Sequence, residues 1–143
     1  GQAVIQMEYA MGSAIQSFDQ PKVLIVNRDR FFPVKKTSDL LLLSSDYVSL
    51  SQNGLIWDVN RMVDIQCSFP FDSVDAFYRY CRVIPSLKDI QSLHLKGKIY
   101  FNHFVTLKGH VEIIVDDDDE LVIGPDLEEL NNVRFEAGKF IPF

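Results

Sequence analysis

The stretch LHLKGKIYFNHFVTLKGHVEII, Leu93 to Ile114, repeats its apolar residues at a six-residue step. One register holds Leu93, Ile99, Val105 and Val111, and a companion register holds Leu95, Phe101, Leu107 and Ile113. A six-residue period does not fit an α-helix, and a sheet meander would not keep it so regular. It is typical of hexapeptide coils in a parallel β-helix, where each hexad supplies one short strand and one corner. We therefore expect both registers to point inward and to stack into a continuous core.

Four consecutive aspartates, Asp116 to Asp119, interrupt this repeat. The step from Val111 to Leu121 is ten residues, which equals one hexad plus four. We expect the aspartates to form a solvated insertion, after which the coils continue in phase. A site for Mg²⁺ or Ca²⁺ is the alternative, but the run lacks the alternating ligand spacing of a calcium loop.

The region before the repeat has the pattern of an α/β layer. Apolar residues from Val4 to Phe18 recur at three- and four-residue steps, which predicts a helix with one buried face. Pro21 disfavours helical geometry in the residue before it. The run KVLIV, Lys22 to Val26, is short and rich in β-branched residues, which predicts a buried strand. A helix followed by a buried strand is typical of α/β folds.

Two further helices are expected between this strand and the repeat. Thr37 or Ser38 can cap the first of them, with Asp39 in its first turn. Asp72 or Ser73 begins the second, which places Val74, Phe77 and Cys81 on one face and ends before Pro85.

The junction RDRFFPVKKTSDLLLL, Arg28 to Leu43, concentrates positive charge. Its four cations within nine residues are Arg28, Arg30, Lys35 and Lys36. Pro33 fixes its own φ and biases the residue before it towards extended structure, so the backbone that presents Lys35 is restrained. Ligands of open α/β sheets bind at the carboxyl ends of strands, and a lysine beside a helix N-terminus suits a phosphate. A solvated basic turn that offsets Asp29 and Asp39 is the alternative.

Histidines supply a second candidate chemistry. His103 and His110 fall at or near expected coil corners, where hexapeptide acyltransferases use a histidine. No long substrate loop accompanies them, and the coil stack is short. We therefore expect these histidines, with His94, to lie on the solvated surface.

The composition narrows the class of protein. The 143 residues carry a net charge of −6 and a pI of about 4.9, which argues against a general nucleic-acid binder. No apolar run approaches the roughly 18 residues that a membrane helix needs. Cys67 and Cys81 lack metal-ligand spacing, so we expect reduced thiols and a cytoplasmic setting. The sequence begins without methionine, as if it were part of a longer protein.

Three blocks, read in order, resemble one known family. They are the helix VIQMEYAMGSAIQSF (residues 4–18), the junction RDRFFPVKKTSDLLL (28–42) and VIPSLKDIQSLHLKG (83–97), which leads into the coils. Together they resemble the C-terminal third of eukaryotic-type UTP–glucose-1-phosphate uridylyltransferases, also called UDP-glucose pyrophosphorylases. The resemblance covers nearly the whole chain and is most specific in PVK-x-T-x-D-L-L-L, here residues 33–42. It is weakest over residues 51–71.

The resemblance implies a fold of the α/β class. Residues 1–70 would form the C-terminal end of a Rossmann-like nucleotidyltransferase domain, residues 71–90 a linker helix, and residues 91–143 a small left-handed parallel β-helix. It also implies a reaction, the transfer of a uridylyl group from UTP to glucose 1-phosphate. Mg²⁺ would be bound mainly through substrate phosphates and by an N-terminal catalytic part.

The resemblance also implies site residues. The lysine of the family's Pro-Val-Lys motif contacts substrate phosphate and falls on Lys35, which becomes the expected catalytic and substrate-binding residue. Arg28 and Arg30 are expected to help bind substrate, or to pair with structural acids.

Partners and other functions stay open at this point. In the family, such β-helices contact other subunits, so a homo-oligomer is a further expectation. The apolar tail of Phe140, Ile141 and Phe143 either caps the last coil or meets a partner. The alternative functions are a non-catalytic oligomerisation module, a hexapeptide acyltransferase, or a related UDP-sugar or UDP-N-acetylhexosamine pyrophosphorylase.

Overall fold

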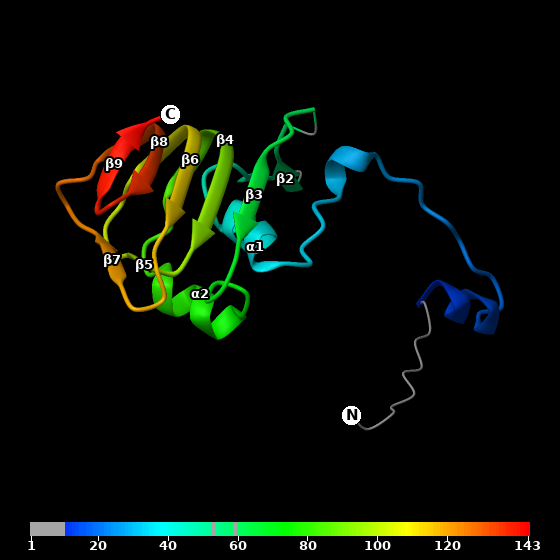
Figure 1. The fold of residues 1–143 in the computed structure, drawn as a ribbon. Helices are drawn as coiled ribbons and strands as arrows, with labels where there is room; N and C mark the ends of the chain where they lie inside the picture. Colours follow the sequence, from blue (N-terminus) through cyan, green and yellow to red (C-terminus); the bar gives the residue numbers. More distant parts are fainter. Residues whose placement is uncertain (1–10, 53, 59) are drawn as a thin grey trace, which may run out of the picture.

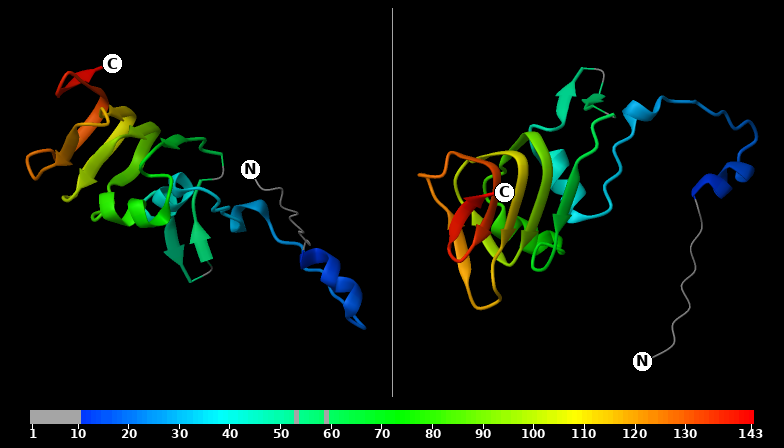
Figure 2. Two further views of the ribbon diagram at one scale, coloured as in Figure 1. Left: turned by 60° about the horizontal axis from the view of Figure 1, so that its bottom comes forward. Right: turned by 45° about the horizontal axis from the view of Figure 1, so that its top comes forward.

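Parallel strands stacked side by side form the centre of this mixed α/β structure (Figures 1 and 2). The structure is a computed structural model and describes residues 11–52, 54–58 and 60–143. One sheet has the order β3-β4-β6-β8-β9, with bounds Asp64–Cys67, Ser86–Lys96, Thr106–Ile114, Glu129–Glu136 and Lys139–Pro142. A second sheet pairs β5 (Lys98–Phe101) with β7 (Glu120–Ile123). The chain therefore passes from β4 through β5 in the other sheet before it returns to β6, parallel to β4.

The register of these strands follows the hexads. Leu93 in β4 lies opposite Val111 in β6, a separation of 18 residues or three hexads. Ile99 in β5 lies opposite Leu121 in β7, and Val111 lies opposite Val133 in β8, each a separation of 22 residues. The difference of four confirms the predicted insertion, and the side chains of Asp116 to Asp119 are exposed.

The predicted core of the repeat is confirmed. All eight apolar positions of the two registers are at most 1% exposed: Leu93, Leu95, Ile99, Phe101, Val105, Leu107, Val111 and Ile113. The corner between β4 and β5 turns at Gly97, whose φ is +93° and whose α-carbon faces the backbone of Val115. The chain at this corner packs backbone against backbone, which a residue with a side chain would prevent.

The stack begins before the predicted repeat. β3 pairs with β4 in parallel, with Cys67 opposite Leu95, and helix α2 (Val74–Tyr80) lies between these strands in the chain. Ser73 caps α2, as one of the two predicted options, because its Oγ accepts a hydrogen bond from the backbone N–H of Ala76 at 3.2 Å. The β3–β4 pairing joins residues on both sides of segment 71–90, which we predicted as a linker helix.

The predicted buried face of α2 is partly correct. Phe77 and Cys81 are buried, whereas Val74, in the first turn of the helix, is 56% exposed.

Side chains form hydrogen bonds with the part of the β4 edge that is not paired with β3. The carboxylate of Asp46 accepts a hydrogen bond from the Oγ of Ser86 at 2.6 Å and from the backbone N–H of Leu87 at 2.8 Å. The guanidinium of Arg61 donates to the carbonyls of Lys88 and Ile90. Polar backbone groups at this edge are thus satisfied by side chains where no strand lies beside them.

Removing the Arg61 guanidinium is expected to destabilise the chain. We expect Arg61→Ala to lower the free energy of unfolding by about 1.5–3 kcal/mol, the usual contribution of hydrogen bonds to a charged group. Urea unfolding of the chain measures this, with Arg79→Ala, on the exposed face of α2, as the matched control. Equal stability of the two variants would show that the edge of β4 does not need the guanidinium.

The C-terminal strand covers β8, the last of the parallel strands in its sheet. β9 pairs antiparallel with β8, and the ring of Phe140 packs against that of Phe135 with centroids 5.1 Å apart. Capping within the chain is therefore confirmed for Phe140. Phe143, in contrast, stays 64% exposed beside His110.

The region before the junction differs from the prediction. Residues Met11–Ser17 form a 3₁₀ helix, η1, and Ile15 and Phe18 are exposed, so their predicted burial is wrong; the earlier residues of the predicted helix, Val4 among them, lie outside the described residues. The predicted buried strand Lys22–Val26 is also wrong. Its residues are extended but unpaired, and Ile25 is 91% exposed.

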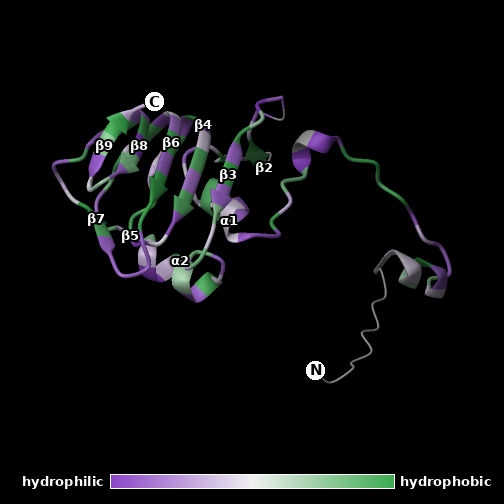
Figure 3. Cartoon of the chain, in the orientation of Figure 1, coloured by the Kyte–Doolittle hydropathy of each residue, from purple (hydrophilic) through white to green (hydrophobic). Residues whose placement is uncertain are grey.

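This unpaired segment runs away from the stacked strands and is visibly hydrophobic (Figures 1 and 3). A strand forms only where a neighbouring strand satisfies its N–H and C=O groups. Within the described residues no strand pairs with residues 22–26. The β propensity of the segment alone is therefore not enough to form a strand there.

The two thiols are free and shielded. Burial raises the pKa of Cys67 and of Cys81 to about 12. None of the helices in the described residues is long and apolar enough to span a membrane.

The raised pKa predicts slow thiol chemistry. At pH 8 we expect both cysteines to react with a disulfide reagent at least tenfold more slowly than glutathione does, because the thiolate is the nucleophile and is disfavoured by burial. The same shift lowers the free energy of unfolding as pH rises from 9 towards 12, where only the unfolded thiols ionise. Absorbance of the released thiolate reports the rate, and urea should restore fast reaction. Fast labelling of the folded chain contradicts the assigned burial.

Candidate phosphate-binding site

The junction that precedes helix α1 (Thr37–Ser44) is held from one side by aromatic packing. The ring of Phe32 is half-buried and meets Trp57 edge-on, with centroids 5.0 Å apart. Pro33 follows directly and fixes its own φ. Phe31 and Val34 are exposed, so Phe32 carries the packing on this side.

The carboxylate of Asp39 holds the junction from the other side. Its Oδ2 accepts hydrogen bonds from the backbone N–H of Lys35 at 2.8 Å and of Lys36 at 2.9 Å. Lys36 is therefore the N-cap residue, and the predicted caps Thr37 and Ser38 are buried residues of the first turn. Asp39 reaches back from the third helical position, in the manner of the acid in a capping box.

A hollow of about 210 Å³ opens beside this turn. It lies between the start of α1 and the start of α2, and is lined by Val34, Lys35, Lys36, Thr37, Leu40, Asp72 and Val74. Its lining carries two lysines and one carboxylate, that of Asp72. It is the place where the predicted phosphate-binding lysine meets a concave surface.

The Lys35 ammonium is available to a ligand. The ion pairs that the structure shows between described side chains are His94–Glu112, Lys108–Glu129 and Arg134–Glu136, and none of them uses Lys35. Asp39 binds the backbone of Lys35, and no bond to its ammonium is seen between the described side chains. The side chain of Asp29, the other acid of the predicted basic turn, lies outside the described residues.

The two arginines of the junction lie elsewhere. Arg28 and Arg30 bound the short 3₁₀ helix η2 (Arg28–Arg30), which contacts β2 (Gly54–Ile56) of the hairpin formed with β1 (Ser49–Ser51). The guanidinium carbon of Arg28 lies 4.9 Å from the ring centroid of Phe31. Neither arginine lines the hollow beside Lys35, so the structure brings together the lysines and not the arginines.

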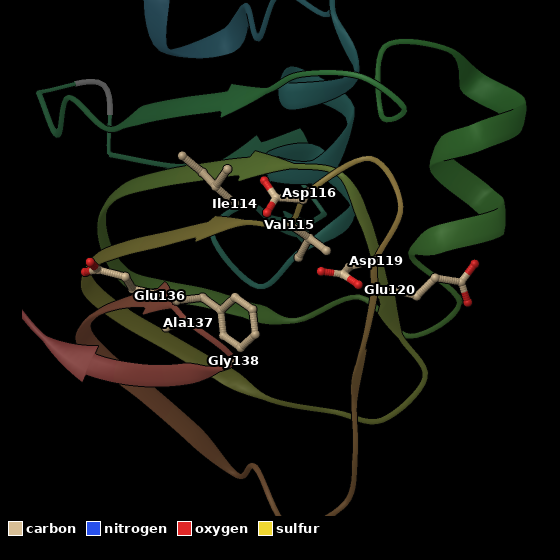
Figure 4. A pocket seen from close by; sticks show the side chains of 9 residues that line it. Ile114, Val115, Asp116, Asp119, Glu120, Glu136, Ala137 and Gly138 are labelled. Atoms are coloured by element: carbon tan, nitrogen blue, oxygen red, sulfur yellow. The ribbon is translucent and has the colours of Figure 1, made fainter.

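A larger hollow at the end of the coils is lined by acidic residues (Figure 4). It measures about 520 Å³, with Ile114, Val115 and Phe135 among its apolar residues and four carboxylates around them, those of Asp116, Asp119, Glu120 and Glu136. Carboxylates repel phosphate groups, so this hollow does not suit an anionic substrate.

The histidines and acids do not assemble a second catalytic centre in the described residues. His103 is exposed, His110 Nδ1 lies 2.8 Å from the Oγ of Ser92, and His94 is half-buried beside Glu112. Within the described ranges, no group of three or more His, Cys, Asp or Glu side chains could hold a metal ion. Among the described residues, no such cluster of ligands is therefore available to Mg²⁺.

Two acids of the site were missed from the sequence. Asp39 was predicted as an acid of the first helical turn or as a counter-charge of a basic turn, although an acid three residues after the N-cap is a known signal of a side chain that reaches back. Asp72 reaches the hollow only through the fold, because 37 residues separate it from Lys35.

Comparisons with known proteins agree with one another. The family model described as UTP--glucose-1-phosphate uridylyltransferase matches residues 1–108. The enzyme of that name from Solanum tuberosum is 40% identical over 118 residues, which cover 79% of this chain and 25% of the relative. The enzyme of that name from Saccharomyces cerevisiae is 35% identical over 133 residues, or 91% of this chain and 26% of the relative.

Solved structures give the same result. The UDP-glucose phosphorylase of Trypanosoma brucei superposes with a TM-score of 0.70 at 32% identity, covering 89% of this chain and 29% of that one. A mutant UDP-glucose pyrophosphorylase of Leishmania major, in complex with UDP-glucose, superposes with a TM-score of 0.70 at 29% identity, over 89% of this chain and 28% of that one.

Sequence and structure thus define one class of protein, the uridylyltransferases. The chain belongs to the UTP–glucose-1-phosphate uridylyltransferase family, of which it corresponds to a C-terminal portion. It spans about a quarter of the length of the curated relatives that it matches.

Proposed function

We propose that this chain is the C-terminal portion of an enzyme that makes UDP-glucose and pyrophosphate from UTP and glucose 1-phosphate. An oxygen of the sugar phosphate attacks the α-phosphorus of UTP. The new O–P bond forms as the bond from that phosphorus to the β,γ-diphosphate breaks, and pyrophosphate leaves with the electron pair. The family match and the UDP-glucose complex of the Leishmania relative support this proposal.

Lys35 is the residue of this chain that acts on the reaction. Both reactants are anions, so their approach depends on positioning and on cancellation of charge. An ammonium held beside a concave surface reduces the repulsion and stabilises the charge on the transferring group. The observation that carries the assignment is the placement of Lys35 at a hollow lined by two lysines, on a turn held from both sides.

Arg28 and Arg30 remain proposed helpers in substrate binding. They are on the same junction as Lys35, but outside its hollow. Their contribution would come from the long-range field rather than from direct contact within this chain.

The finer architecture is proposed on two observations. Three-hexad separations and inward-facing apolar residues support a small left-handed parallel β-helix over residues 91–143. The exposed apolar segment 22–26 supports a contact with the remainder of a Rossmann-like catalytic domain, the end of which is residues 1–70, with 71–90 as the linker. Mg²⁺ would be bound by that domain and by the substrate phosphates. The proposed location of the protein is the cytoplasm. The β-helix is the proposed contact between subunits.

Assays of the complete protein test the function. The protein should release pyrophosphate from UTP only when glucose 1-phosphate is present, and UDP-glucose should appear in equal amount. Galactose 1-phosphate and N-acetylglucosamine 1-phosphate serve as competing sugars, because they separate the glucose enzyme from the related pyrophosphorylases. Faster turnover with either competitor would overturn the sugar assignment.

A further inference from the structure

We propose that Asp39 is a positioning residue that fixes the Lys35 ammonium at the substrate by binding the backbone of Lys35 and Lys36. This inference rests on the proposed function, since it assigns a partner to the lysine that acts there. It concerns geometry: the carboxylate does not touch the substrate, and it acts through Lys35.

The carboxylate binds the backbone at the position that matters most. A single oxygen, Oδ2, accepts both N–H groups, at 2.8 and 2.9 Å. Two bonds to consecutive residues restrain the peptide planes on both sides of the Lys35 α-carbon. The direction in which the Lys35 side chain leaves the backbone is therefore set by Asp39.

Asp39 is itself held by the core. It lies on α1 between buried residues of the same helix. Thr37 and Ser38 come before it, and Leu41 and Leu42, which are 1% and 9% exposed, come after it. A continuous series of contacts therefore runs from the apolar core through α1 and the carboxylate to Lys35. Support of this kind holds a reacting group in position before the reaction begins. The group then needs no reorganisation during the reaction.

The carboxylate leaves the ammonium free. An acid this close to two lysines would normally be expected to form an ion pair with one of them. Oδ2 instead accepts main-chain N–H groups, and no ion pair between Asp39 and either lysine is seen among the described side chains. The positive charge of Lys35 stays available to a phosphate, while its position is fixed.

Variants at Asp39 separate geometry from charge. Asp39→Asn keeps an oxygen that can accept both N–H groups, and we expect kcat within about threefold of the parent. Asp39→Glu keeps the charge but moves the oxygen by one methylene, and Asp39→Ala removes the acceptor. We expect both to lower kcat by about tenfold or more, with KM for glucose 1-phosphate changed much less. The reverse order, with Glu active and Asn impaired, would overturn the inference, because charge and not geometry would be the requirement.

A double mutant in the complete protein tests whether Asp39 acts through Lys35. If it does, Lys35→Ala/Asp39→Ala should turn over within about threefold of Lys35→Ala alone, because there is no ammonium left to position. Losses that multiply would show a merely structural role and overturn the inference. Should Asp39→Ala fail to fold, the comparison of Lys35→Ala/Asp39→Glu with Lys35→Ala gives the same answer.

Asp75 supplies the matched control. It is likewise an acid in the first turn of a short helix, α2, with an exposed side chain, and it is not among the residues lining the hollow beside Lys35. Asp75→Ala should leave kcat unchanged. If Asp39→Ala also keeps parental kcat while Lys35→Ala loses activity, the positioning role is wrong and the proposed function stands. If Lys35→Ala itself keeps activity, the function proposed for Lys35 fails first.

Discussion

Replacing Lys35 with alanine in the complete protein is expected to lower turnover about a hundredfold or more. Loss of one preorganised donor to a charged transition state typically raises the barrier by about 2.7–4 kcal/mol, and each 1.36 kcal/mol is about tenfold in rate. The ammonium acts on charge that develops during transfer, so kcat should fall more than KM rises. Initial rates of pyrophosphate release, at several concentrations of each substrate, measure this.

Two other lysines give this experiment its controls. Lys36 lines the same hollow, so Lys36→Ala shows whether one ammonium or two matter, and we expect a loss of less than tenfold. Lys88 is exposed on β4 and is not part of that hollow, and Lys88→Ala should behave like the parent. A folded Lys35→Ala protein with a near-normal rate, checked by its melting temperature, would remove the catalytic role of this residue.

The second large effect is on stability, at Gly97. A Cβ there would lie 2.2 Å from the carbonyl oxygen of Val115 and 2.9 Å from its carbonyl carbon, and backbone atoms cannot move aside as a flexible side chain does. The φ of +93° adds strain for any residue other than glycine. We expect Gly97→Ala to lower the free energy of unfolding by about 3–5 kcal/mol, the sum of backbone strain and overpacking. Urea unfolding curves of the chain provide the measurement.

Two glycines separate strain from contact. Gly138 has a φ of +78° and no atom within 4 Å of an added Cβ, so Gly138→Ala should cost about 1–2 kcal/mol, through strain alone. Gly124 has neither feature, and Gly124→Ala should change stability by less than about 0.5 kcal/mol. A Gly97→Ala variant no less stable than Gly138→Ala would mean that the corner can open without loss, contrary to the packing seen at Val115.

The core of the repeat was predictable because the six-residue spacing of its apolar residues can be read from the sequence alone. Three hexads return the backbone to the same face, so Leu93 and Val111 were expected to stack if either was buried. In the sheet these two residues, 18 apart in the sequence, do lie opposite each other. The same arithmetic located the four extra residues before Leu121. Lys35 could be proposed from a motif, since a proline and an adjoining helix start are local features of sequence; its role stays a prediction.

Features that depend on distant partners were not predictable. The run Lys22–Val26 has strand propensity, yet its state depends on strands that the described residues do not include. Asp46 and Arg61 complete the edge of β4 from 41 and about 27 residues away, and nothing in their neighbours marks that role. Asp72 lines the hollow beside Lys35 only because the fold brings the start of α2 close to the start of α1.

The four-aspartate loop bears on how this scaffold tolerates change. Asp116 to Asp119 are exposed, and β7, which follows them, keeps an unbroken parallel pairing with β5, so the side chains of this loop take no part in the strand pairing. The loop is thus a natural point for grafting an epitope or a fluorescent reporter, whereas residues added within Thr106–Ile114 would enter a strand whose pairing on both sides already contains register shifts.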